Sequence, residues 1–161
     1  TEIRNLGMKA GLYDEGMYPS GSAHGMVVRD NPEFASRLLR EVKTADASEQ
    51  EAAEAVFALR FRRGKLAEYR RLKPGEECPP GFECVEYRCG YTGGHIRGLY
   101  EDEDDGGSNA PPSADLLNPA AVEKFLRLTY DRYHEAAGDF FGSTVIGIFT
   151  DEPCIQGRGA K

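Results

Sequence analysis

The chain has 161 residues, of which 40% are hydrophobic and 29% are charged, with a net charge of −7 and a pI near 5.1. This size and composition predict a globular domain with a sizeable core, and the acidic balance argues against a nucleic-acid partner because phosphate binding needs Lys and Arg. No apolar run approaches the roughly 18 residues of a membrane span, so we expect no membrane partner.

The first half of the chain predicts a strand, a loop and a helix. Residues 8–14 form a short, mostly apolar segment, which is typical of a buried parallel strand. A loop rich in Gly and Pro follows over 16–25. The sequence Asn31-Pro32-Glu33 combines an N-cap, a first-turn Pro and an acidic first turn. Since Phe34, Leu38 and Val42 follow at helical spacing, we predict a helix over 32–45.

The middle of the chain predicts β-structure. Alternating apolar residues on both sides of Arg63-Gly64 indicate a β-hairpin over 57–72 with one face in water. A loop over 73–83 leads to a further alternating segment, 84–91, which we predict to be a strand.

A second helix and a final strand complete the predicted order. Asn118-Pro119 repeats the helix start signal, and an apolar stripe extends the helix over 119–137. The segment 144–150 is the last apolar strand. Strands joined through helices imply an α/β fold with a parallel sheet. We therefore divide the chain into a strand and helix (1–48), an inserted hairpin (49–83), and further strands with a helix (84–161).

Two other features bear on ligands and redox state. The acidic run 101–105 is interpreted as a solvated loop, with calcium binding or a lid over a cationic ligand as alternatives. The four cysteines form no C-x-x-C pair, so no zinc knuckle is predicted, and we assign no residue as a metal ligand. Cys78 and Cys84 flank a Pro-Pro-Gly turn and could form a disulfide, but we expect free thiols.

Polar residues gather where the predicted strands end, which is where parallel α/β folds bind ligands. The candidates for substrate contact are Asp14, Glu15, Asp151, His24, His95 and Arg97, and Glu152 is the candidate general acid. Paired carboxylates suit glycoside hydrolysis, in which one carboxyl group protonates the leaving oxygen and another attacks the sugar or activates water. Tyr13, Tyr18 and Tyr91 could stack on sugar rings or pack in the core.

Three segments in order along the chain, 12–21, 114–119 and 149–153, resemble uncharacterised bacterial glycoside hydrolases of the α-L-rhamnosidase-like or β-galactosidase-like kind. The segment 145–153 also resembles the end of the fourth barrel strand in clan A glycoside hydrolases, although Asp151 stands where that family has Asn. The resemblance implies a partial (β/α)₈ TIM barrel, strands two to four, with Glu152 as the general acid/base.

The same resemblance places the second essential carboxylate beyond Lys161, so we expect no glycosidase activity from this chain alone. No cofactor is expected, and the partner is a carbohydrate substrate. Unpaired sheet edges would favour a homo-oligomer, unless the hairpin covers an edge. The alternatives are a non-catalytic carbohydrate-binding module and a phosphate- or nucleotide-binding module. Localisation is open, with the cytoplasm slightly favoured.

Overall fold

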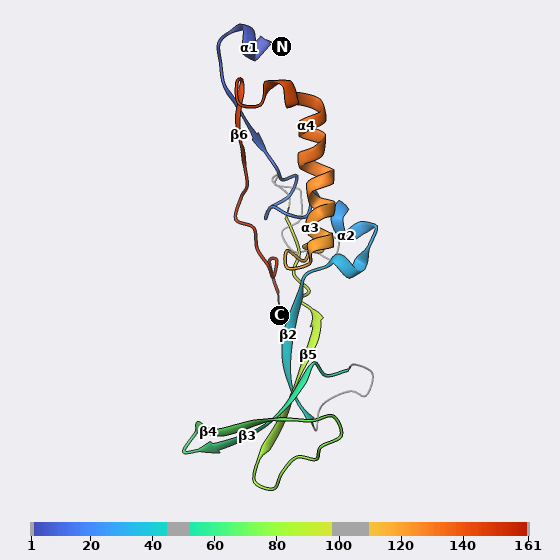
Figure 1. The fold of residues 1–161 in the computed structure, drawn as a ribbon, viewed down its shortest axis with the longest axis vertical. Coiled ribbons are helices and arrows are strands. Elements are labelled where there is room, and N and C mark those ends of the chain that lie inside the picture. The colour runs from blue at the N-terminus through green and yellow to red at the C-terminus, as the bar shows by residue number, and fades with distance from the viewer. Residues whose placement is uncertain (1, 45–51, 98–109, 161) are drawn as a thin grey trace. The chain divides into compact units, whose positions relative to one another are not determined.

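The computed structural model describes residues 2–44, 52–97 and 110–160 (Figure 1). This part of the chain divides into two compact units, residues 1–37 with 91–161 and residues 38–90. The predicted hairpin insertion, 49–83, falls in the second unit. The acidic run 101–105 lies outside the described residues.

The first unit is built on two parallel strands. β1 (Ala10–Tyr13) pairs with β6 (Val145–Phe149), with Tyr13 opposite Phe149 and their rings 5.2 Å apart. The predicted parallel pairing of 8–14 with 144–150 is therefore confirmed. Two short helices lie earlier in the unit: α1 (Glu2–Asn5) precedes β1, and α2 (Met26–Arg29) follows the loop after β1.

A longer helical segment runs beside the two strands and confirms the helix predicted over 119–137 (Figure 1). It consists of α3 (Pro119–Leu126), a π-helical turn (Arg127–Asp131) and α4 (Arg132–Ala137). Asn118 caps its start by accepting a hydrogen bond from the Ala120 N–H at 3.0 Å. A 3₁₀ turn (Gly138–Phe140) then leads towards β6.

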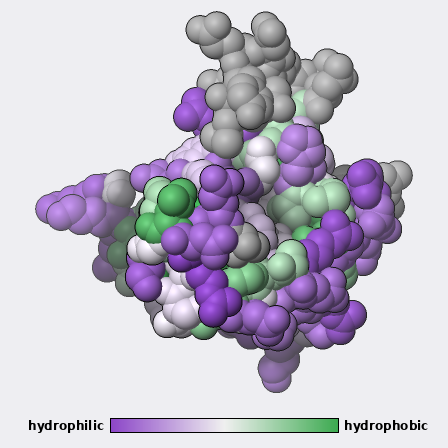
Figure 2. All heavy atoms as spheres, turned by 90° about the horizontal axis from the view of Figure 1, so that it is seen from above, coloured by the Kyte–Doolittle hydropathy of each residue, from purple (hydrophilic) through white to green (hydrophobic). Residues whose placement is uncertain are grey.

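The core of the first unit lies between α2 and α3. Its buried members are small or medium-sized apolar side chains, with one aromatic ring among them: Ala23, Val27, Val28, Ala114, Ala121 and Phe125. Burying such side chains is the main favourable contribution to folding. Seen from above, the surface is mostly hydrophilic, with hydrophobic residues in small separate groups (Figure 2).

The second unit holds a four-stranded antiparallel sheet in the order β2-β5-β3-β4. Its strands are β2 (Arg37–Lys43), β3 (Ala55–Arg62), β4 (Lys65–Leu72) and β5 (Glu83–Tyr91). The predicted hairpin is confirmed as β3 and β4, joined at Arg63-Gly64. Among the described residues, no helix is long and apolar enough to cross a membrane.

The prediction of a partial TIM barrel is wrong. The segment 84–91 does not extend the parallel sheet, because β5 pairs antiparallel with β3 in the other sheet. The helix predicted over 32–45 is also wrong. Only a 3₁₀ turn, Pro32–Phe34, follows the Asn31 cap, and the chain then becomes β2.

The expectation of free thiols is wrong for two of the four cysteines. Cys78 and Cys84 form a disulfide, while Cys89 and Cys154 are free. The bridge closes the loop between β4 and β5, where the guanidinium of Arg60 lies 4.0 Å from the centre of the Phe82 ring.

Candidate functional site

Two pairs of acidic residues follow the carboxyl ends of β1 and β6, at the same end of the strand pair. The backbone N–H of Asp14 donates to the carbonyl of Phe149 at 3.2 Å, so the chain leaves both strands at the same end of the pair. Asp14 and Glu15 follow β1 there, and Asp151 and Glu152 follow β6. We call these four residues the carboxylate cluster.

Asp14 is the buried member of the carboxylate cluster, with 2% of its surface exposed. Its carboxylate accepts hydrogen bonds from the hydroxyl groups of Ser20 at 2.7 Å, Tyr130 at 2.7 Å and Thr150 at 2.6 Å. These donors come from the loop after β1, from the helical segment and from the end of β6. Asp14 therefore ties three parts of the first unit together.

Two tyrosine hydroxyl groups hold the carboxylates that follow β6. Tyr13 donates to Asp151 at 2.6 Å, and Tyr18 donates to Glu152. In each pair the hydrogen bond to the carboxylate is the main cause that raises the pKa of the phenol above its usual value. Both phenols therefore stay protonated and remain donors at physiological pH.

The loop after β1 is fixed against the end of β6 by Ser20. The backbone N–H of Asp151 donates to the Ser20 hydroxyl at 2.9 Å, and the Ser20 N–H donates to the Asp151 carbonyl at 3.1 Å. The same hydroxyl donates to Asp14. One serine thus connects both acidic pairs.

Glu15 has surroundings unlike those of its neighbours. Both carboxyl oxygens are buried, and neither has a hydrogen-bond partner among the described residues. Burial raises the pKa of Glu15, and the charges of Asp151 and Asp14 raise it further. Glu15 therefore keeps its proton to a higher pH than an ordinary glutamic acid.

We expect Glu15→Gln to raise the free energy of unfolding at pH 7 and to leave it nearly unchanged near pH 4. The folded pKa of Glu15 lies above its unfolded value, so the folded chain loses stability as the pH rises through that interval. The Gln variant lacks this loss. Urea unfolding at a series of pH values measures the difference, and a gain that is equally large at pH 4 would contradict the assigned cause.

Glu152 is the exposed member of the carboxylate cluster. Its backbone φ is 40°, in the left-handed region that residues other than Gly seldom adopt. Such strain costs about 1 kcal/mol or more and is concentrated at functional sites. Beyond the end of β6 the Tyr18 hydroxyl donates a hydrogen bond that fixes the Glu152 carboxylate.

The three basic residues predicted to contact substrate, Arg97, His24 and His95, lie in different surroundings. Arg97 lies with its guanidinium 5.3 Å from the centre of the Tyr18 ring, and the two backbones exchange hydrogen bonds of 2.8 Å. His24 is exposed, with φ 55°, and its ring lies against Gly16. His95 exchanges backbone hydrogen bonds with Arg158 instead. Arg97 and His24 thus neighbour residues that adjoin the carboxylate cluster, while His95 belongs to a separate contact.

Ser20, Thr150 and Tyr130 were missed by the sequence analysis as site residues. Tyr130 lies on the apolar stripe of the predicted helix and was therefore assigned to packing. Of the tyrosines proposed to stack on sugars, Tyr13 and Tyr18 donate to members of the carboxylate cluster. Tyr91 donates to Glu33 at 2.9 Å, which is outside the cluster.

No known protein family, curated protein or solved structure matches this chain. The likeness to glycoside hydrolases therefore rests on the three sequence segments alone. Among the described residues there is also no group of three or more His, Cys, Asp or Glu placed to hold a metal ion.

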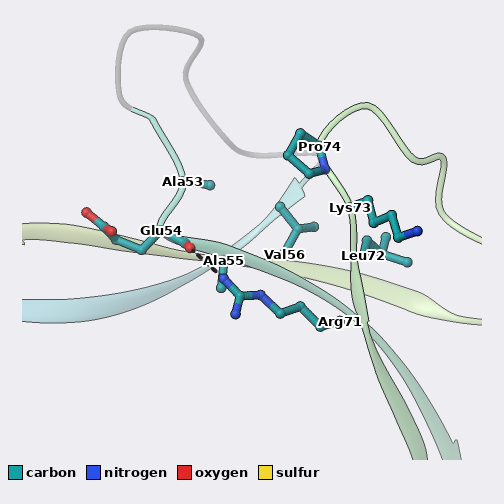
Figure 3. A pocket seen from close by; sticks show the side chains of 8 residues that line it. All are labelled: Ala53, Glu54, Ala55, Val56, Arg71, Leu72, Lys73 and Pro74. Carbon is teal, nitrogen blue, oxygen red and sulfur yellow. Dashed lines mark hydrogen bonds between the residues drawn. The ribbon is translucent and has the colours of Figure 1, made fainter.

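A hollow of about 490 Å³ lies in the second unit, between the start of β3 and the end of β4 (Figure 3). Arg71 crosses it and donates to the backbone carbonyl of Glu54 at 3.4 Å. The side chains of Glu54 and Lys73 point away from each other (Figure 3). Because its polar groups do not converge, this hollow is a weaker candidate for chemistry than the carboxylate cluster.

Proposed function

We propose that the carboxylate cluster binds a carbohydrate and that Glu152 is the acid/base group for hydrolysis of a glycosidic bond. The observation that carries the proposal is the gathering of four carboxyl groups with unlike surroundings at one end of a parallel strand pair. Asp14 is buried and fully hydrogen-bonded, whereas Glu152 is exposed and held by Tyr18. Glu152 is therefore the member that a ligand can reach.

The chemistry needs two carboxyl groups in different protonation states, and unlike surroundings produce such a difference. The raised pKa of Glu15 favours its protonated form beside Asp151. Asp151 accepts a hydrogen bond from the Tyr13 hydroxyl at 2.6 Å. In this proposal Glu152 meets the substrate, and Glu15 and Asp151 set the electrostatic surroundings in which it works.

A second candidate is carbohydrate binding without turnover. The oxygens of Glu15 are enclosed and those of Asp14 are occupied by protein donors, so Glu152 is the one exposed carboxyl group of the carboxylate cluster. A two-carboxylate reaction then requires that a ligand expose Glu15 or Asp151. A phosphate or nucleotide ligand is less favoured, because its charge would be repelled by the cluster.

The test uses a basic iminosugar, whose protonated nitrogen imitates the positive charge that develops on the sugar during hydrolysis. We expect Glu152→Gln to weaken iminosugar binding at least about tenfold, and to lower any turnover of nitrophenyl glycosides by about 100-fold or more. Calorimetric titration and a chromogenic assay measure the two effects. Glu135→Gln, an exposed change of the same charge in α4, is the matched control.

Each result has a distinct meaning. Turnover that Glu152→Gln abolishes supports hydrolysis, and shows that a second carboxyl group is present within these 161 residues. Binding lost in Glu152→Gln without turnover in the parent chain supports the carbohydrate-binding candidate. Equal behaviour of Glu152→Gln and Glu135→Gln, or no binding of any sugar or iminosugar at millimolar concentration, would reject both.

A further inference from the structure

The β3–β4 hairpin extends past its neighbour in the sheet. β3 pairs with β5 only as far as Leu59, whereas its pairing with β4 continues to Arg62 opposite Lys65. Residues 60–66 therefore form a two-stranded end that projects beyond β5 (Figure 1). We call residues 60–66 the hairpin tip.

A β-bulge concentrates apolar side chains on one face near this tip. The register passes from Arg60 opposite Glu68 to Phe61 opposite Leu66, which leaves Ala67 without a partner. The extra residue shifts the alternation by one, so Leu66 and Tyr69 lie on the same face although they are three residues apart. Without the bulge, Leu66 would point to the opposite face.

The resulting face is apolar and open. Phe61, Leu66 and Tyr69 are 49%, 52% and 66% exposed. Farther along the same face is a hollow of about 450 Å³, and its lining is largely apolar: Leu39, Ala55, Phe57, Leu59, Leu66, Tyr69 and Tyr87, with Glu54. Exposed apolar area of this kind usually marks an interaction surface.

Positive charge is concentrated in the same hairpin, with Arg62 and Lys65 on the face opposite Phe61 and Leu66 and Arg63 at the turn. Seven of the residues from Ala55 to Lys73 are Lys or Arg and one is acidic, in a chain whose net charge is −7. Within the described part of the chain, the side chains of Arg62, Arg63 and Lys65 make no hydrogen bond or ion pair. Arg60, by contrast, pairs with Glu68 at 3.1 Å.

We propose that the hairpin tip docks on an anionic lipid surface, with Phe61 and Leu66 entering the headgroup region while the unpaired cations meet lipid phosphates. The partner must supply negative charge and an apolar medium within the width of one hairpin. An anionic bilayer supplies both. An acidic glycan or a nucleic acid supplies the charge, but offers no apolar medium for Leu66 and Phe61.

The proposed contact differs from the expectation of no membrane partner, which considered spanning segments alone. Docking at the surface needs no spanning segment, because a few apolar side chains and cations suffice when both act together. The argument uses residues of the second unit alone, so it does not depend on the function proposed for the carboxylate cluster.

Arg63→Asn removes one tip cation without harming the turn. Arg63 and Gly64 have φ values of 52° and 74°, and two consecutive positive values favour Asn-Gly at these positions. A loss of docking in this variant therefore cannot be attributed to misfolding. Arg132→Gln removes one exposed cation from α4 in the other unit and is the matched control.

The experiment sediments the full chain with neutral phosphatidylcholine vesicles, or with vesicles that contain about 30% phosphatidylglycerol, at low and physiological salt. We expect binding to the anionic vesicles only, weakened about fivefold by Arg63→Asn and unchanged by Arg132→Gln. The paired change Phe61→Thr with Leu66→Thr should weaken binding at least about tenfold. Both positions are half exposed and Thr suits strands, so the fold is retained.

Three results would overturn the proposal. The first is no binding of the parent chain to anionic vesicles. The second is an equal loss of vesicle binding in Arg63→Asn and Arg132→Gln. The third is binding that the Phe61→Thr and Leu66→Thr change leaves intact, which would reduce the contact to charge alone. In that last case dextran sulfate should bind the tip as tightly as the anionic vesicles do, and the partner would be a soluble polyanion.

Discussion

Gly94→Ala should lower the free energy of unfolding by about 3 kcal/mol or more. A Cβ atom at Gly94 would lie 1.9 Å from the carbonyl oxygen of Gln156 and 2.9 Å from its carbonyl carbon. Both are backbone atoms, so no side-chain rotation can relieve the contact. One of the two chain segments would have to move.

Neither segment can move without breaking hydrogen bonds. The hydroxyl of Thr92 donates to the Gln156 carbonyl at 2.8 Å, and the N–H of Gly94 donates back to that hydroxyl at 2.9 Å. On the other side, the Ser113 N–H donates to the Gly94 carbonyl at 3.0 Å. The contact therefore joins three segments that are distant in sequence, and separating them would leave buried polar groups unpaired.

Gly147→Ala is the matched control, because nothing lies within 4 Å of a Cβ built at Gly147 in the middle of β6. Its effect should stay within about 0.5 kcal/mol or be slightly stabilising, since Ala restricts the unfolded chain more than Gly does. Urea unfolding followed by circular dichroism compares the two variants. Similar midpoints for both would show that the close approach at Gly94 does not limit stability.

The sequence predicted correctly the elements whose signals are local and long. The helix over 119–137 has a cap at Asn118 and a sustained apolar stripe, and the structure confirms it. The hairpin has alternating residues around Arg63-Gly64 and is also confirmed. The parallel pairing of 8–14 with 144–150 was predicted because short apolar strands alternate along the chain with predicted helices, and it is also confirmed.

The helix predicted over 32–45 failed because its spacing fits two structures. Phe34, Leu38 and Val42 are four residues apart, which matches one face of a helix but is also a multiple of the two-residue period of a strand. Asn31 does cap a helical element, but that element is a single 3₁₀ turn. The choice between helix and strand was made by pairing with the distant β5, which no local pattern contains.

The barrel interpretation failed for a related reason. Alternation over 84–91 predicted a strand but could not say which sheet it joins. In the structure it lies between β2 and β3, and the register with β3 places Phe57 opposite Val85. The resemblance extended the barrel to this segment, whereas β5 belongs to a separate four-stranded sheet with β2 and the hairpin.

The candidate site was predictable in its acidic residues but not in what holds them. Asp14, Glu15, Asp151 and Glu152 stand out because they follow predicted strands. Their donors are single hydroxyl groups on a loop and on a helix, such as Ser20 and Tyr130, and hydroxyl residues of this kind are common in any sequence. Only the three-dimensional contact distinguishes them.

Asp14→Ala should lower the free energy of unfolding by about 3 kcal/mol, because three donors, of which Ser20 is buried and Tyr130 half-buried, lose the buried carboxylate that accepts from all of them. The donors are the hydroxyl groups of Ser20, Tyr130 and Thr150, each within 2.7 Å of the Asp14 carboxylate. Asp14→Asn should lower the free energy of unfolding almost as much, because its NH₂ group brings further donors to a site that already has three. Asp131→Ala, at an exposed acidic position in the helical segment, is the control and should change the free energy by less than about 0.5 kcal/mol.

Urea unfolding at pH 7 measures these variants, and Tyr130→Phe in the wild-type and Asp14→Ala backgrounds tests the assigned contact. If the hydroxyl of Tyr130 acts through Asp14, its removal should cost about 1 kcal/mol or more in the wild type and little in the Asp14→Ala chain. Equal costs in both backgrounds would mean that the two groups are not coupled. A loss below about 1 kcal/mol for Asp14→Ala would go further, because a carboxylate that contributes so little to the fold would be available to a ligand beside Glu152.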